Sequence, residues 1–330
     1  MKRSFGDDYY ADSAKTPNWH KADQHLAGKL EPLLKALDLD APHRVKQVVD
    51  SWRQKIHTRL RAATQLGRSE AGGMKVDIEV TSKVPPPVLE RLLALPEPLL
   101  WVLIHRQEIA STRRGLDAVR GQLGLLNGPG GFPGIGLGEQ EIAPVADAFR
   151  KLDETAVRRA DEEIQAILGL RGDVLGAYYY RRRPVQIELH WIVIWIIATR
   201  LRVATDDLAL VVLVHEMAHF YTHQGQDADG DPWDTDAFHR ADLNIAEGLA
   251  QFYTEVVLLQ LAEAGNPKPM EAFEALFRNQ PEPYQCFRQW VPRHKKRIEV
   301  VRRALVQARA RGIGDYGHFL HLLDGGASDL

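Results

Sequence analysis

The fold of this chain is decided by the stretch LALVVLVHEMAHF, which runs from Leu208 to Phe220. It contains no glycine or proline, and its only polar side chains are His215, Glu216 and His219. An apolar run of this length predicts a helix that is buried on all sides. Residues four apart share a helix face, so both histidines can reach one metal ion, with Glu216 beside them. The stretch therefore predicts a buried metal-binding helix, with ordinary core histidines as the alternative.

A third ligand is expected downstream, because a catalytic zinc site generally takes three protein ligands and leaves one position for water. Glu247 lies in NIAEGLAQFYTE, residues 244–255, whose apolar spacing predicts a second helix. The alternative for Glu247 is a capping box, in which it would fold back on the first turn behind Asn244. His223 continues the spacing of the first two histidines. On a continuous helix it lies about 12 Å from His215, which is too far to share the ion.

These two segments together resemble the gluzincin-type zinc metallopeptidases, whose metal is held by the two histidines of H-E-x-x-H and by a glutamate in a downstream E-G-x-A helix. The similarity covers about residues 208–255. It implies a Zn²⁺ cofactor held by His215, His219 and Glu247. It also implies that Glu216 acts as the general base in the hydrolysis of peptide bonds.

The separation of the two segments is also similar to that of the ImmA/IrrE-type cytoplasmic regulatory metallopeptidases, which cleave repressors. The chain departs from the aminopeptidase and thermolysin-like patterns, because Ala246 rather than asparagine precedes Glu247, and no subfamily is assigned. Two other functions stay open. The same metal could serve the hydrolysis of non-peptide amides or esters, or zinc could be structural in a binding module. Glu216 favours an enzyme, because a structural site needs no base.

The resemblance further implies a downstream tyrosine or histidine that stabilises the negative charge developing on the substrate carbonyl. Tyr284 is the first choice, because the prolines of QPEPY, residues 280–284, fix its loop, and a packing role alone is the alternative. Four other residues stay open for this role: Tyr253, Tyr316, His239 and His318. A peptide substrate would extend along a sheet edge, and the β-rich segments 174–180 and 185–190 are the candidates for it.

The expected fold class is α+β and predominantly helical, with a zincin-like catalytic domain that has a small sheet and an active-site helix. Apolar spacing predicts a helix over residues 42–66, and alternation predicts a strand over 74–83. The stretch NGPGGFPGIGLG, residues 127–138, predicts a linker. The sequence therefore predicts a mostly helical N-terminal region, 1–140, followed by the catalytic domain, 141–330.

The composition is that of an ordinary globular chain, with 45% hydrophobic and 26% charged residues among 330. A net charge of −2 gives no sign of a nucleic-acid partner, although the basic segments 44–68 and 293–311 keep a DNA-binding regulator as a rival hypothesis.

The single cysteine, Cys286, fits a reducing compartment. No apolar run approaches the roughly 20 residues of a membrane span. We expect a cytoplasmic protein with a peptide or protein substrate and no membrane partner, and the sequence leaves its oligomeric state open.

Overall fold

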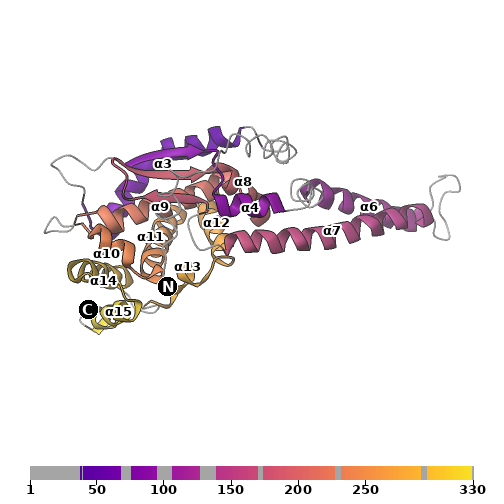
Figure 1. The fold of residues 1–330 in the computed structure, drawn as a ribbon. Helices are drawn as coiled ribbons and strands as arrows, with labels where there is room; N and C mark the ends of the chain where they lie inside the picture. Colours follow the sequence, from indigo (N-terminus) through magenta and orange to yellow (C-terminus); the bar gives the residue numbers. More distant parts are fainter. Residues whose placement is uncertain are drawn as a thin grey trace. The chain divides into compact units, whose positions relative to one another are not determined.

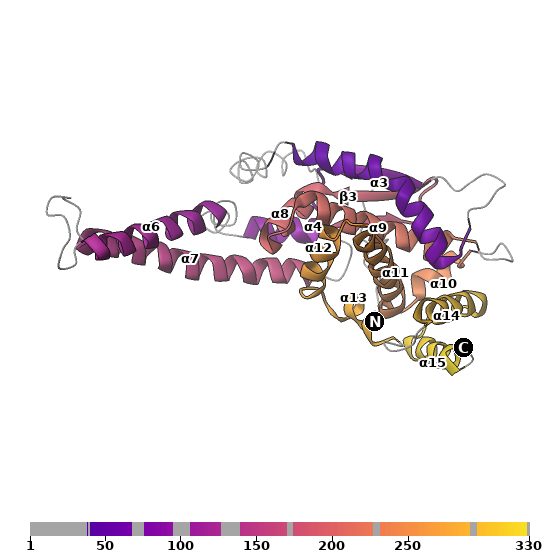
Figure 2. The ribbon, with the colours of Figure 1, turned by 180° about the vertical axis from the view of Figure 1, so that it is seen from behind.

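The computed structural model describes residue 38 and residues 40–67, 76–94, 106–126, 139–169, 174–226, 232–290 and 296–328. In this part of the chain helices predominate and one small sheet is present (Figures 1 and 2), in agreement with the predicted α+β class. The expected linker, 127–138, lies outside the described residues. Among the described helices, none has the length and apolarity that crossing a membrane requires.

The described residues divide into two compact units. One unit takes its residues from 39–85 and 168–330, and the other takes them mainly from 86–167. Residues that come early in the sequence thus belong to the same unit as the second half of the chain. The reason is that helix α3 (Ala41–Thr64) and strand β1 (Val76–Thr81), which come early in the sequence, pack with elements from the second half of the chain.

The unit from 86–167 is helical, with α4 (Pro86–Ala94), α6 (Arg106–Leu126) and all but the last residue of α7 (Glu139–Leu168). Helices α6 and α7 run alongside each other in both views (Figures 1 and 2). An ion pair joins them, with 4.0 Å between an Arg120 guanidinium nitrogen and the Asp147 carboxylate. Both groups are about half exposed, so this pair adds little stability.

The larger unit contains the three-stranded sheet, in the order β1-β3-β2. Strand β3 (Val185–His190) lies in the centre, parallel to β1 and antiparallel to β2 (Gly176–Tyr179). The predicted strands are therefore confirmed, and the two β-rich segments form a hairpin. Strand β2 stands at one edge of the sheet, with Gly176 opposite Leu189.

Helix α9 (Thr205–Gln224) occupies the core of the larger unit. It contacts β2 and β3 as well as the helices α3, α8 (Trp191–Leu201) and α11 (Leu243–Glu263) (Figure 1). Every residue of α9 from Leu208 onward is buried, as its apolar sequence predicts. The remaining elements follow α9 in the chain: α10 (Thr235–Arg240), α12 (Lys268–Phe277), α13 (Glu282–Gln285), the 3-10 helix η2 (Cys286–Gln289), α14 (Arg297–Arg311) and α15 (Tyr316–Ser328).

Candidate metal centre

Helix α9 supplies the two histidines of the site. Asp206 and Asp207 lie in its first turn, where negative charge complements the helix dipole. Because the helix continues unbroken to Gln224, His215 and His219 project from neighbouring turns of one face. Both side chains are buried, with 8% and 4% of their surfaces exposed.

Helix α11 supplies the third candidate ligand and packs directly against α9. The helix begins at Leu243, and its N-cap is Asp242, whose carboxylate accepts a hydrogen bond from the Asn244 backbone N–H at 3.0 Å. Asn244 is thus inside the helix and caps nothing. The capping-box alternative for Glu247 is wrong, because Asp242 already occupies the capping position.

Gly248, next to the ligand, lets the chain pack closely behind α11. A Cβ atom at this position would lie 2.6 Å from Cη2 of Trp290 and 3.0 Å from Sγ of Cys286. The Trp290 indole is itself held by a hydrogen bond from its Nε1 to the Tyr316 hydroxyl, at 3.0 Å. The residue after the ligand is therefore glycine for a steric reason.

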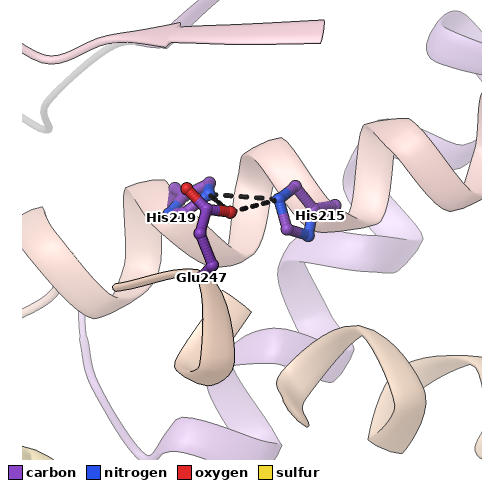
Figure 3. Close-up of side chains that lie close together, drawn as sticks. All are labelled: His215, His219 and Glu247. Carbon is purple, nitrogen blue, oxygen red and sulfur yellow. Dashed lines mark hydrogen bonds and ion pairs between the residues drawn. The ribbon is translucent and has the colours of Figure 1, made fainter. Parts of the chain in front are cut away.

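Glu247 reaches across to both histidines (Figure 3). Its Oε2 lies 3.3 Å from Nε2 of His215 and 3.3 Å from Nε2 of His219, and the two Nε2 atoms are 3.1 Å apart. Ligands about 2.0–2.1 Å from a zinc ion stand roughly 3.3 Å apart in a regular tetrahedron. The three atoms therefore form one face of a tetrahedron of the right size for a metal ion.

The charges of the cluster also suit a cation. Burial lowers the pKa of His215, so its imidazole stays neutral near pH 7 and can act as a ligand. Burial raises the pKa of the Glu247 carboxyl, but the adjacent His219 and His215 lower it by more, so the net pKa is low and the carboxylate is ionised. A buried carboxylate is costly unless a positive charge compensates it. The residues present therefore fit a divalent metal ion.

A pocket opens beside this cluster, with about 480 Å³ of space that includes open solvent. Its polar lining consists of His215, Glu216, Gln251, Gln280 and Tyr284. Its apolar lining consists of Leu168, Val174, Leu175, Val211, Val212 and Leu276. The pocket thus brings together one candidate metal ligand, Glu216 and Tyr284 in a mostly apolar space.

The edge strand packs closely against Glu216 in this pocket. A Cβ atom at Gly176 would lie 2.7 Å from Glu216 Oε1 and 2.9 Å from a methyl group of Val212. Only glycine leaves room for the carboxylate at this place in β2. The sequence did not predict a role for Gly176, because no pattern near it indicates a contact with a residue 40 positions away.

Tyr284 lies on the pocket wall, where its ring centroid is 5.9 Å from that of His215. The other four candidates for its role do not line this pocket. The His239 ring bonds to the Tyr180 hydroxyl, and the Tyr316 hydroxyl accepts from Trp290. Tyr253 is wholly buried, and His318 is exposed, with Nδ1 3.6 Å from Asp315.

Gln251 is a second pocket residue that sequence reasoning missed. It stands one helical turn after Glu247, on the face of α11 that meets the site. The position four residues after a ligand is a signal that could have found it.

No family model matches this chain, and neither the curated proteins nor the solved structures with which it was compared include a match. The candidate metal centre therefore rests on its own geometry.

Proposed function

We propose that this chain is a zinc-dependent peptidase of gluzincin type, in which His215, His219 and Glu247 hold the metal. The observation that carries the proposal is the triangle of ligand atoms, with sides of 3.1–3.3 Å, beside a pocket that contains Glu216. A zincin-like fold for the larger unit is part of the same proposal. A buried metal cluster without a base would fit a structural site equally well, so Glu216 favours catalysis.

Two imidazole nitrogens and one carboxylate oxygen form a ligand set that suits zinc and leaves a fourth position for water or substrate. Zinc bound there would act as a Lewis acid on the scissile carbonyl and would lower the pKa of water toward about 7.

Glu216 takes the proton of the attacking water and later delivers it to the leaving nitrogen. This role requires a carboxylate that faces the substrate and cannot swing away. The place of Glu216 in the pocket lining supports the first requirement, and the close packing of Gly176 against Oε1 supports the second.

Tyr284 faces the same pocket, and its phenol is the donor that we assign to the carbonyl oxygen as negative charge develops there. A neutral phenol can donate this hydrogen bond without losing its own proton.

A peptide is the substrate that the edge strand favours. The His190 N–H donates to the Leu175 carbonyl at 2.9 Å, so Leu175 pairs with β3. Backbone groups alternate in direction along an antiparallel strand, so those of Gly176 and Tyr178 point away from β3. All four residues of β2 are buried, so an extended peptide that adds to this edge as a further strand, close to Glu216, must displace the residues that cover it.

The test is Glu216→Gln in the full chain, measured by zinc content and by cleavage of a mixture of random peptides. The amide cannot accept the proton, so cleavage should fall at least about 100-fold while zinc content stays at one per chain. As controls, a chelator should abolish wild-type cleavage and added zinc should restore it. Cleavage by Glu216→Gln near the wild-type rate would reject the proposal.

A further inference from the structure

Two glutamine side chains give the apolar pocket a polar end. Gln251 comes from α11 and is only 2% exposed, and Gln280 comes from the turn that follows α12. The walls beside them are aliphatic, including Leu175, Val212 and Leu276. A glutamine inside such walls needs hydrogen-bond partners, because burying a bare amide costs free energy.

The amide of Gln251 bonds to the side-chain amide of Gln280. Its Nε2 donates to Oε1 of Gln280 at 3.1 Å. The turn that carries Gln280 is itself fixed, because Nε2 of Gln285 donates to the backbone oxygens of Gln280 at 2.7 Å and of Phe277 at 2.9 Å. One of the two N–H donors of Gln251 is thereby satisfied.

The acceptor side of Gln251 is not satisfied. Oε1 is buried and has no hydrogen-bond partner among the described residues. A buried acceptor of this kind discriminates strongly in favour of a ligand that donates to it, because every other ligand leaves it unpaired. The group that completes it must therefore bring an N–H or O–H donor into the pocket.

We propose that this pocket is the subsite for a substrate residue with a carboxamide side chain, glutamine or asparagine, whose N–H donates to Oε1 of Gln251. The inference rests on the proposed function, and it names the substrate class of the same site. The aliphatic walls accommodate the methylene part of such a side chain. They disfavour a lysine ammonium, whose charge would lose its hydration against apolar surface. Gln251 is thus a specificity residue, and Gln280 positions it.

His215 offers the main competing explanation. Its Nδ1 is also buried without a hydrogen-bond partner among the described residues, and His215 lines the same pocket. If Gln251 accepted from this nitrogen, it would orient a metal ligand and would not select substrates. The two roles differ in one observable, because the second predicts that replacing Gln251 weakens zinc binding.

The experiment measures binding, so it does not depend on turnover. Three peptide hydroxamates of identical backbone, with glutamine, methionine or glutamate as the variable residue, are titrated into the zinc-loaded full chain by calorimetry. The wild type should bind the glutamine compound about 10-fold to 100-fold more tightly than the methionine compound, and the glutamate compound more weakly still. In Gln251→Met the preference for glutamine should fall below about threefold, with zinc affinity unchanged.

Two further variants complete the design. Gln280→Met should reduce the preference by freeing the Gln251 amide to rotate. Gln289→Met, an equivalent change at an exposed position, should leave the preference intact.

Three results would overturn the subsite: equal binding of the glutamine and methionine compounds, tighter binding of the glutamate compound, or no binding of any hydroxamate by zinc-loaded protein. If Gln251→Met loses zinc affinity and binds all three compounds more weakly by the same factor, Gln251 orients the ligand His215 and does not select substrates. If the preference is found but no peptide is cleaved, the peptidase proposal fails and the subsite stands.

Discussion

Helix α9 carries three histidines at intervals of four residues, and their surroundings differ. His215 and His219 face the carboxylate of Glu247. His223 packs against aromatic rings, with its ring 4.3 Å from that of Phe238 and its Nδ1 3.0 Å from the Tyr178 hydroxyl. Each step of four residues turns the side chain by about 40° around the axis, so the third histidine has left the face of the first.

Both regions hold a histidine whose pKa is lowered by burial, but they differ in the charged groups around it. Burial lowers the pKa of His215, and burial together with Arg309 and Arg183 lowers that of His223 to about 3. Among the residues that the structure describes, only the first region forms a histidine and carboxylate group that could hold a metal ion. Equal spacing in the sequence thus produces a group that could hold a metal ion at one end of the stripe and a neutral core histidine at the other. The carboxylate from α11 is what separates them.

The largest effect should come from replacing one histidine in each region. His215→Ala removes one of the three proposed ligands. Losing a residue that only hydrogen-bonds to a metal ligand typically lowers metal affinity about 10-fold to 100-fold, so the loss of His215 should lower zinc affinity by more than that. His223→Gln keeps a hydrogen-bonding group for Tyr178 and should leave zinc affinity unchanged. Titration with a competing zinc chelator measures both variants. A metal loss in His223→Gln as large as in His215→Ala would remove the distinction between the two regions.

A smaller effect should come from the packing that brings the carboxylate to α9. Gly248→Ala places a methyl group 2.6 Å from the Trp290 ring, so we expect a loss of about 1–3 kcal/mol in the free energy of unfolding. Replacing a helical glycine that has open space around it should not destabilise the protein. Gly325→Ala in α15 meets nothing within 4 Å and should be neutral or stabilising by up to about 1 kcal/mol. Urea denaturation of both variants checks the pair, and equal effects would refute the steric account.

The contribution of His223 to stability should depend on pH. Its folded-state pKa, about 3, lies below the unfolded value of 6.5, so the unfolded chain binds a proton that the folded chain refuses. Stability should therefore fall as the pH drops from about 6.5 toward 3, and His223 contributes up to about 1.4 kcal/mol per pH unit. Urea unfolding in the presence of a chelator should show a shallower slope for His223→Gln than for the wild type. Identical slopes would show that His223 does not titrate in this way.

Local pattern was sufficient to predict the helices that carry the ligands. The apolar run before His215 specifies a buried helix, and the spacing around Glu247 specifies its partner, because both signals lie within one element. The start of α11 was harder to predict, because Asp242 and Asn244 are both good capping residues and the local sequence does not decide between them.

Contacts between distant parts of the chain could not be predicted in the same way. Gly176 packs against Glu216, and Gly248 packs against Trp290. The residues in each pair are about 40 positions apart, and no local sequence pattern predicts either contact. The pairing of β1 with β3 joins residues more than 100 positions apart.

Zinc binding by the wild type and by Glu247→Gln tests the central claim most directly. Elemental analysis of the purified wild type should find one zinc ion per chain. Glutamine offers a neutral oxygen in place of an anionic one, so zinc affinity in Glu247→Gln should fall at least about 10-fold while helix content is unchanged. A wild type that binds no zinc, or a Glu247→Gln variant with wild-type affinity, would contradict the assignment of this cluster as a metal centre.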